Sequence, residues 1–228
     1  MAGDKPVLPV LRTKAEAQSS YDRLSRWYDL ISGTGELNLG IETLDRMDLP
    51  VGGTILEVGF GTGKILLELL GRVGETGIVY GVDLSPGMCH ITKKRLDEAG
   101  MPERAMLAVG DGYRLPIADD RVDAVFMGFT LELFDTPELA PVIQECLRIM
   151  KPGGRLGIVT LSITSRPGLA ERLYKKAHEY WPRLVDCRPI DPGSLLVELG
   201  ESGIASTNVV YGKLWGLSVA QMVLEKMG

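Results

Sequence analysis

Short apolar runs alternate with helix-length segments through most of this 228-residue chain. The apolar runs are TILEVG, GIVYGVDL, MLAVGDG, VDAVFMGF and RLGIVTLS, and they scarcely alternate between polar and apolar residues. Between them stand KILLELLGRV, SPGMCHITKKRLDEAG and PELAPVIQECLRIM, whose apolar spacing is that of helices. Strands linked by helices of this length form crossover units, and strands without alternation are covered on both faces. The chain therefore predicts an α/β fold built on a parallel sheet.

The C-terminal part predicts two further strands. ASTNVVYGKLWGLSVAQMVLEK has the pattern of a hairpin that turns around Gly212–Gly216. The two strands of a hairpin run in opposite directions, so one of the seven must run against the rest. We expect a Rossmann-like, seven-stranded, mostly parallel sheet with helices on both faces and an antiparallel last strand.

The chain is expected to divide near residue 48. Residues 1–13 predict a loose arm, and residues 14–31 have the spacing of an amphipathic helix. The stretch GTGELNLGIETLDRM predicts a loop followed by a second short helix, and KPGG at 151–154 predicts a turn. Residues 1–48 thus form an N-terminal arm and helical cap, and residues 49–228 a ligand-binding domain with a helical insertion at about 163–190.

Three glycines stand at alternate positions after the first strand. They are Gly59, Gly61 and Gly63, and the segment after them has helical spacing. Glycines at such a turn allow left-handed backbone and let a ligand approach the main chain. The dinucleotide pattern G-x-G-x-x-G is not matched, because Lys64 and Leu66 occupy the places of its third glycine. This mismatch argues against a nicotinamide-dependent oxidoreductase and suits a nucleoside without a pyrophosphate.

An acidic residue follows each of the first three strands. Glu57, Asp83 and Asp111 would lie at one edge of a parallel sheet, where such folds bind ligands. An acid after the second strand can accept both ribose hydroxyls, and one after the third can accept from an adenine amino group. Glu57 lies where it can orient an ammonium, directly or through the glycine loop. The ligand predicted by these residues is a nucleoside joined to an amino acid.

Together with RIMKPGGRL after the fourth strand, these residues resemble the class I S-adenosylmethionine-dependent methyltransferases over roughly residues 53–160. The resemblance implies S-adenosyl-L-methionine as cofactor and S-adenosyl-L-homocysteine as product. It implies that the three glycines line the methionine part of the cofactor and that Asp83 holds the ribose. The remaining cofactor residues it implies are Leu84 and Met88 against adenine, Asp111 and Gly112 at the adenine amino edge, Gly128, and Tyr28 as part of a lid.

Within that superfamily the chain is most similar to the ubiquinone/menaquinone-biosynthesis C-methyltransferases and their small-molecule relatives. YDRLSRWYDLISG, the glycine loop, GDGYRLPIADDRVDAVFMGF and LRIMKPGGRL carry the similarity. Those quinone enzymes have an Arg-Asn pair just after the fourth strand, where this chain has Glu132 and Leu133. The substitution of an acid for a cation weakens the expectation of quinone-ring methylation. Bacterial phospholipid N-methyltransferases share similar patterns and are kept as an alternative.

The expected reaction is an in-line methyl transfer to a small, partly apolar acceptor. Glu132 is the candidate base if the acceptor must lose a proton. The acceptor pocket is expected from the aromatic residues of the cap and insertion and from the end of the fourth strand, namely Trp27, Phe129, Tyr174, Tyr180 and Trp181. Two readings from other classes are a nicotinamide-dependent oxidoreductase and a non-catalytic cofactor-binding scaffold.

Charge and composition narrow the range of partners. The net charge is −5, the sequence pI is about 5.2, and no basic stripe is present, so nucleic acid is not expected as a partner. No run approaches the ~20 apolar residues of a membrane span, which leaves only peripheral contact through the N-terminal helix. Three scattered cysteines predict a reducing cytoplasm, and two histidines without ligand spacing predict no metal site. The acceptor, the methylated atom and the oligomeric state are left open.

Overall fold

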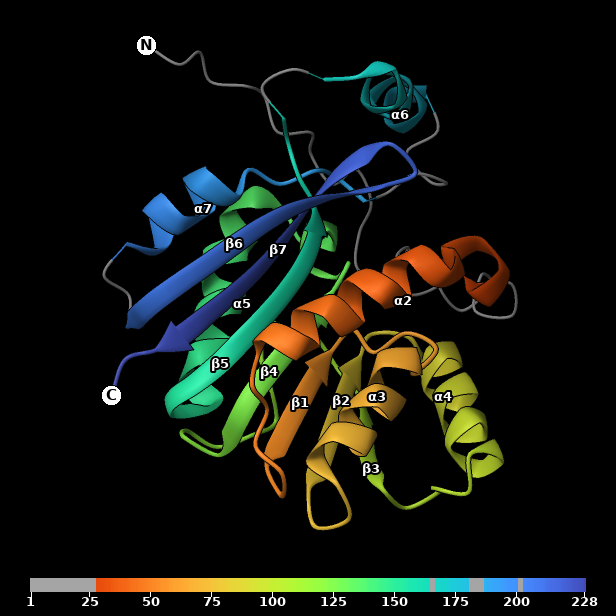
Figure 1. The fold of residues 1–228 in the computed structure, drawn as a ribbon, viewed down its shortest axis with the longest axis vertical. Helices are drawn as coiled ribbons and strands as arrows, with labels where there is room; N and C mark the ends of the chain where they lie inside the picture. Colours follow the sequence, from red (N-terminus) through yellow and green to blue (C-terminus); the bar gives the residue numbers. More distant parts are fainter. Residues whose placement is uncertain (1–27, 165–166, 181–186, 201–202) are drawn as a thin grey trace.

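A computed structural model describes residues 28–164, 167–180, 187–200 and 203–228. Its sheet has the strand order β3-β2-β1-β4-β5-β7-β6. The strands are β1 (Thr54–Val58), β2 (Ile78–Asp83), β3 (Ala105–Val109), β4 (Val122–Gly128), β5 (Met150–Leu161), β6 (Ile204–Leu214) and β7 (Leu217–Lys226). Strands β1 to β5 pair in parallel, whereas β7 pairs antiparallel with both β5 and β6. This arrangement confirms the seven-stranded, mostly parallel sheet with an antiparallel last strand (Figure 1).

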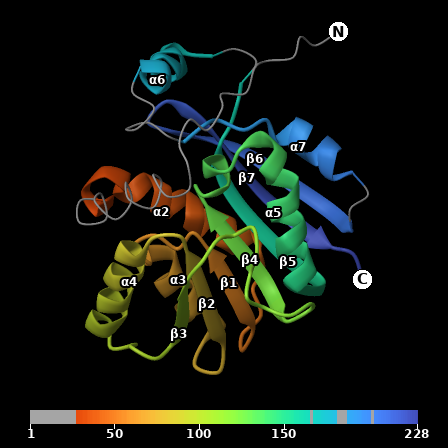
Figure 2. The same ribbon diagram turned by 180° about the vertical axis from the view of Figure 1, so that it is seen from behind.

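Helices cover both faces of the sheet, as expected. One face carries α2 (Tyr28–Arg46), α3 (Lys64–Val73) and α4 (Pro86–Glu98), which lie in front of the strands in Figure 1. The other face carries α5 (Thr136–Ile149) and α7 (Pro192–Leu199), which come forward in Figure 2. A separate apolar core fills each layer, so the strands are buried on both sides.

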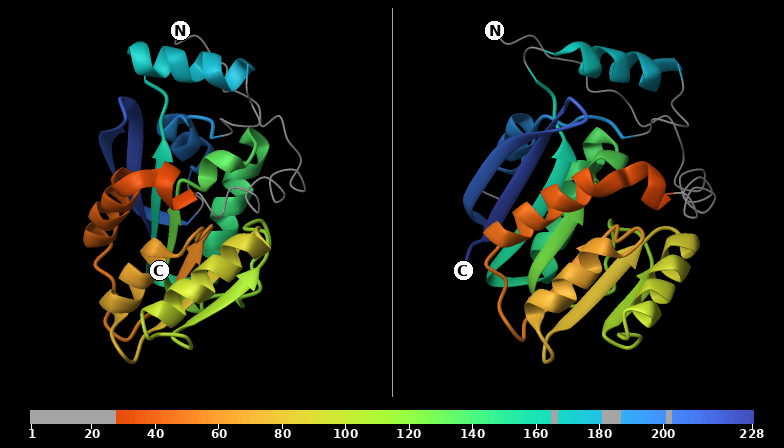
Figure 3. Two further views of the ribbon diagram at one scale, coloured as in Figure 1. Left: turned by 90° about the vertical axis from the view of Figure 1, so that its right-hand side faces the viewer. Right: turned by 45° about the vertical axis from the view of Figure 1, so that its right-hand side comes forward.

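Two further helical segments lie at the carboxyl ends of the strands. The short 3-10 helix η1 (Leu131–Leu133) follows β4 directly. Helix α6 (Leu169–Tyr180) falls within the expected insertion and lies beyond the carboxyl end of β5 (Figure 3). Among the described helices, none combines the length and the apolar character needed to cross a membrane.

Local sequence signals fix the boundaries of α4 and α5. Ser85 caps α4 by accepting a hydrogen bond from the Met88 backbone N–H at 3.1 Å, and Pro86 occupies the first helical position. Asp135 and Glu138 form a reciprocal capping box at the start of α5. The cap and first position of α4 were both predicted from the sequence.

The region expected as a loop before the second short helix is instead part of one continuous helix. Helix α2 runs from Tyr28 to Arg46 and contains three glycines. A Cβ atom on Gly40 would lie 2.5 Å from the Ile65 side chain, and one on Gly35 would lie 2.5 Å from Leu214. The glycines that suggest a loop therefore let α2 pack closely against α3 and the β6–β7 hairpin. Packing of this helix outweighs the low helix propensity of glycine.

The KPGG segment is also different from its expectation. It belongs to β5, which begins at Met150, and the β4–β5 pairing shifts register between Val122 and Ala124. A Cβ atom on Gly154 would lie 2.8 Å and 2.9 Å from two backbone carbonyl oxygens, those of Lys151 and Asp123. The glycine is needed for this close approach inside an irregular strand.

The structure describes only part of the N-terminal region to which the sequence predictions apply. The arm and the helix predicted over residues 14–31 lie outside the described residues, apart from the backbone that opens α2. The division of the chain near residue 48 stays a prediction.

Candidate functional site

The glycine loop joins β1 to α3 with three left-handed glycines. The φ angles of Gly59, Gly61 and Gly63 are 73°, 51° and 78°. A Cβ atom would collide with Thr130 at Gly59 and with Thr92 at Gly63, whereas at Gly61 it would meet no described residue within 4 Å. The outer two glycines therefore serve packing within the protein, and Gly61 presents bare backbone to open space.

Asp83 ties this loop to the end of β2. Its Oδ2 accepts a hydrogen bond from the Gly61 N–H at 2.9 Å, and its Oδ1 accepts one from the Ser85 N–H at 2.8 Å. On the other side, the Thr92 hydroxyl donates to the Gly61 carbonyl at 2.9 Å. A carboxylate oxygen can accept more than one hydrogen bond. The loop is thus held in place before any ligand binds.

Glu57 is a buried acid beside the loop. Its exposed fraction is 3%, and its Oε2 has no hydrogen-bond partner among the residues that the structure describes. Burial, and after it the charge of Asp83, raises the pKa of Glu57 well above its ordinary value. A buried polar atom without a partner is costly, so this carboxyl is matched to a ligand that carries a hydrogen-bond donor or a positive charge.

A pocket of about 570 Å³, partly open to solvent, adjoins these groups at the carboxyl ends of β1 and β4. Predicted site residues from separate segments line it together, namely Glu57, Gly59, Gly61, Gly128 and Phe129. Phe129 adopts a left-handed φ of 51°, and its N–H donates to the Val159 carbonyl at 2.7 Å. A non-glycine residue in this conformation is strained, and such residues cluster at functional sites.

Glu36 lines the same pocket and was missed in the sequence. It lies on α2, in the stretch that was expected to be a loop. Desolvation, and after it the charge of Glu132, raises the pKa of Glu36 to about 7 against the opposing charge of Lys64. The spacing of Glu36 and Gly40, four residues apart, places both on one helical face. That spacing could have indicated the site only if the helix had been recognised.

Glu132, the candidate base, is fully buried in η1. Its Oε2 accepts from the Thr160 hydroxyl at 2.8 Å, and its Oε1 accepts from the Leu161 N–H at 3.3 Å. Desolvation raises its pKa to about 7 despite these hydrogen bonds and the charge of Arg188. Glu132 is not among the lining residues of the pocket, and both of its oxygens are bonded. Its role as a base therefore stays a prediction.

Arg188 is a buried cation that sequence reasoning also missed. Its Nε and Nη2 donate to the Phe134 carbonyl at 2.8 Å and 2.6 Å, and its Nη1 donates to the Thr136 hydroxyl at 3.0 Å. A residue far along the chain thus places a positive charge next to η1. This charge is close to Glu132, which stands where the quinone enzymes have an arginine. No local pattern around Arg188 could have indicated this position.

The residues expected around adenine lie along the ends of β2 and β3. Asp83 pairs with Val109 in the β2–β3 ladder, and the Gly110 N–H donates to the Asp83 carbonyl at 2.9 Å. Asp111 is half-buried, and its Oδ1 accepts from the Tyr113 N–H at 3.1 Å. Leu84, which follows β2, is half-buried, and Gly112, which follows β3, is buried. Met88 is buried in the first turn of α4.

The expected acceptor residues are spread more widely. Tyr174 on α6 is half-buried, and its hydroxyl donates to the Cys187 carbonyl at 2.6 Å. Tyr180, at the end of α6, is 74% exposed. Trp27, Trp181 and the side chain of Tyr28 lie outside the described residues.

Comparison with known proteins finds methyltransferases among the relatives of this chain. A methyltransferase-domain family matches residues 55–154. A demethylmenaquinone methyltransferase from Lysinibacillus sphaericus is 31% identical over 72% of this chain and 71% of its own length. One from Oceanobacillus iheyensis is 30% identical over 73% of this chain and 66% of its own length. This chain spans only 47 to 66% of the length of four demethylmenaquinone methyltransferases, one of which is the Oceanobacillus protein.

The fold has solved counterparts. The crystal structure of the (4+2)-cyclase SpnF matches 98% of this chain and 99% of its own, with a TM-score of 0.75 and 19% sequence identity. At this identity the likeness concerns the fold alone. The glycine loop, the acids at the strand ends and the sequence relatives agree, and the chain belongs to the class I S-adenosylmethionine-dependent methyltransferases, as a relative of the demethylmenaquinone methyltransferases.

Proposed function

We propose that this protein transfers a methyl group from S-adenosyl-L-methionine to a small, partly apolar acceptor. The observation that carries the proposal is the open backbone at Gly61 between two acids. One acid, Asp83, is bonded to the loop, and the other, Glu57, is buried with an unpartnered oxygen. This combination suits a ligand that has hydroxyl donors and a cationic group.

The residues present fit this cofactor part by part. The carboxylate of Asp83 would accept from the ribose hydroxyls, and Asp111 on the neighbouring strand would accept from the adenine amino group. The unpartnered oxygen of Glu57 would receive the ammonium. Gly61 would allow the methionine part to lie directly against the backbone, since no Cβ occupies that space.

When bound, the cofactor supplies a methyl group made electrophilic by its positive sulfur. The protein's own contribution is orientation and exclusion of water. The loop is fixed by Asp83 and Thr92, and Phe60, Phe126 and Phe129 provide apolar walls to the pocket. Glu36, whose pKa is about 7, can accept a proton on its carboxylate if the acceptor must lose one. It therefore joins Glu132 as a candidate base.

The names of the relatives support a small-molecule acceptor, because several are demethylmenaquinone methyltransferases. Whether a quinone ring is the acceptor stays open, since Glu132 and Leu133 replace the Arg-Asn pair of the quinone enzymes. The relatives named above are methyltransferases and give no support to the phospholipid, oxidoreductase or scaffold readings. The expectations about nucleic acid, oligomeric state and a cytoplasmic location stay predictions.

Calorimetry and thermal unfolding test the cofactor directly. S-adenosylmethionine and S-adenosylhomocysteine should each bind, and a ligand at 100 times its dissociation constant adds ~2.7 kcal/mol of stability. NAD at the same concentration should add none. Protection by NAD without protection by S-adenosylmethionine would refute the proposal. Binding without methyl transfer to any of a panel of quinols, phenols and amines would favour the scaffold reading instead.

A further inference from the structure

A second cavity, partly open to solvent, lies beneath α6, where β5 ends and β7 begins. Its walls are mostly apolar and come from four parts of the chain. Leu161, Ile163, Tyr174, Pro189 and Leu217 are the residues that form this apolar surface, and we call the cavity the α6 pocket. Apolar walls with few polar groups are typical of small-molecule sites.

One polar atom in this pocket lacks a partner. Ser162 is 4% exposed, and its Oγ has no hydrogen-bond partner within the described part of the chain. Its backbone N–H is bonded, donating to the Ser218 carbonyl at 2.8 Å. A buried hydroxyl left unbonded costs free energy, and a ligand oxygen beside it would remove that cost.

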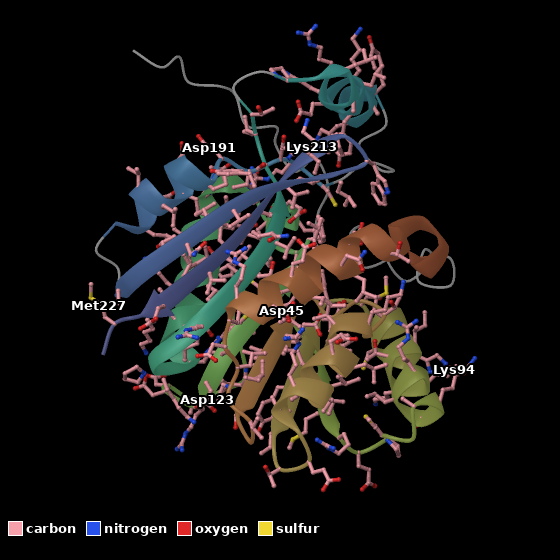
Figure 4. All side chains as sticks on the ribbon, in the orientation of Figure 1. Asp45, Lys94, Asp123, Asp191, Lys213 and Met227 are labelled. Atoms are coloured by element: carbon pink, nitrogen blue, oxygen red, sulfur yellow. The ribbon has the colours of Figure 1, made fainter. Side chains whose placement is uncertain are left out.

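Three other polar residues of the pocket, Glu171, Ser218 and Tyr174, are bonded to the protein. Glu171 accepts from the Ser218 hydroxyl at 2.7 Å and from the Gly168 N–H at 2.6 Å. Desolvation alone would raise the pKa of Glu171, but these hydrogen bonds and the charge of Lys213 hold it below its usual value. Lys213 lies at the hairpin end of β6, close to α6 (Figure 4). The Tyr174 hydroxyl likewise donates a hydrogen bond to the Cys187 carbonyl. These bonds hold the wall of the pocket and leave Ser162 to a ligand.

The α6 pocket is next to the cofactor pocket. Val159 lines the cofactor pocket and Leu161 lines the α6 pocket. The two residues are two apart on β5 and belong to the same apolar core, so they share one face of the strand. Their separation along the strand is therefore about 7 Å. A molecule in the α6 pocket can extend along β5 toward the cofactor.

We propose that the α6 pocket holds the methyl acceptor, and that the acceptor is a mainly apolar molecule with a hydroxyl or carbonyl oxygen that pairs with Ser162. The inference rests on the proposed function, because it assigns the second substrate of the same reaction. The serine hydroxyl can donate to a carbonyl and accept from a hydroxyl, so either oxygen satisfies it.

Two probes of matched shape test this proposal on the full chain. 2-Naphthol carries one hydroxyl on an apolar ring system, and 2-methylnaphthalene replaces that hydroxyl by a methyl group. Fluorescence titration should show that 2-naphthol binds about five- to tenfold more tightly, as expected for one added hydrogen bond. Ser162→Ala should abolish this preference and leave 2-methylnaphthalene binding unchanged. Ile163→Trp, which fills the pocket, should weaken both probes at least tenfold.

Controls separate this inference from the proposed function. Ser194→Ala removes an exposed serine hydroxyl on α7 and should leave both probes unaffected. S-adenosylhomocysteine binding, measured on the same preparations, should change less than threefold in Ser162→Ala and Ile163→Trp. Failure of the cofactor to bind any of these proteins overturns the proposed function. Cofactor binding with no probe binding, or with a naphthol preference that survives Ser162→Ala, overturns the inference alone.

Discussion

At the scale of single residues, the three loop glycines should respond differently to substitution. Gly61→Ala places a methyl group in open space, so the protein should fold with a loss of ~1–2 kcal/mol from its left-handed φ. That methyl group would occupy the cofactor's space, and cofactor affinity should fall at least tenfold by calorimetry. Gly63→Ala should lose more stability, because its Cβ collides with Thr92. If folded Gly61→Ala binds the cofactor with wild-type affinity, the glycine loop has only a structural role as a turn.

Asp83→Asn tests the ribose assignment. The amide keeps one oxygen as an acceptor but loses the charge that now serves Gly61 and Ser85. Affinity for S-adenosylmethionine and S-adenosylhomocysteine should fall about tenfold and equally, since the two share the ribose. Asp191→Asn is a matched control, because Asp191 caps α7 through similar bonds away from the site (Figure 4). Equal affinities in all three proteins would contradict the role of Asp83.

The buried carboxyls predict how stability depends on pH. The pKa of Glu36 and that of Glu132 are about 7, raised from 4.5, so the folded chain keeps protons that the unfolded chain has lost. The free energy of unfolding should therefore fall as pH rises from about 5 to 7, by at most ~1.4 kcal/mol per pH unit for each group. Glu36→Gln should flatten this decline in urea unfolding measured at pH 5, 6, 7 and 8. Parallel curves for the variant and the wild type would exclude a raised pKa at Glu36.

The sequence could predict the site residues that are fixed by chain-local rules. The glycines and the acids at strand ends follow from where a parallel sheet presents its ligands, and several of them do line one pocket. Glu36 and Arg188 could not be predicted in this way. Their positions depend on the packing of α2 and on a segment far along the chain, which no local spacing encodes.

At the scale of elements, two glycines without a positive φ should have opposite effects. Gly154→Ala in β5 would push a methyl group against two backbone carbonyls and should destabilise the protein by ~1–3 kcal/mol. Gly71→Ala in α3 meets nothing within 4 Å and should stabilise it by ~0.5–1 kcal/mol, because alanine favours a helix. Urea unfolding measures both. If Gly154→Ala is as stable as the wild type, the backbone of this part of β5 can move to make room for the added methyl group.

Elements were predictable where propensity and packing agree. In α4 the cap, the proline and the apolar spacing all indicate one helix, and the structure has it. In α2 the glycines favour a loop, but Leu39, Thr43 and Leu44 are buried against the sheet. The burial of that face decides the conformation, and it depends on elements far away in the sequence.

At the scale of the whole molecule, the strand order places the site. From β1 the chain continues to β2 and β3, which lie on one side of β1 in the sheet. The next strand, β4, lies on the other side of β1. Such a reversal opens a crevice at the carboxyl ends of the two strands, and the pocket beside the glycine loop lies there. The hairpin of β6 and β7 was predictable because its two strands adjoin in sequence. The contribution of β7 to the α6 pocket was not, since it depends on pairing with β5.

The raised pKa of Glu36 and the burial of Glu57 have a consequence for proton counting during turnover. The methyl donor carries a sulfonium charge and its product does not, so only the donor should drive these carboxyls to ionise through that charge. Binding of the donor at pH 7 should release more protons to the buffer than binding of the product. Calorimetry in buffers of different ionisation enthalpy would count the difference. Raising the pH should then increase the affinity for the donor relative to the affinity for the product.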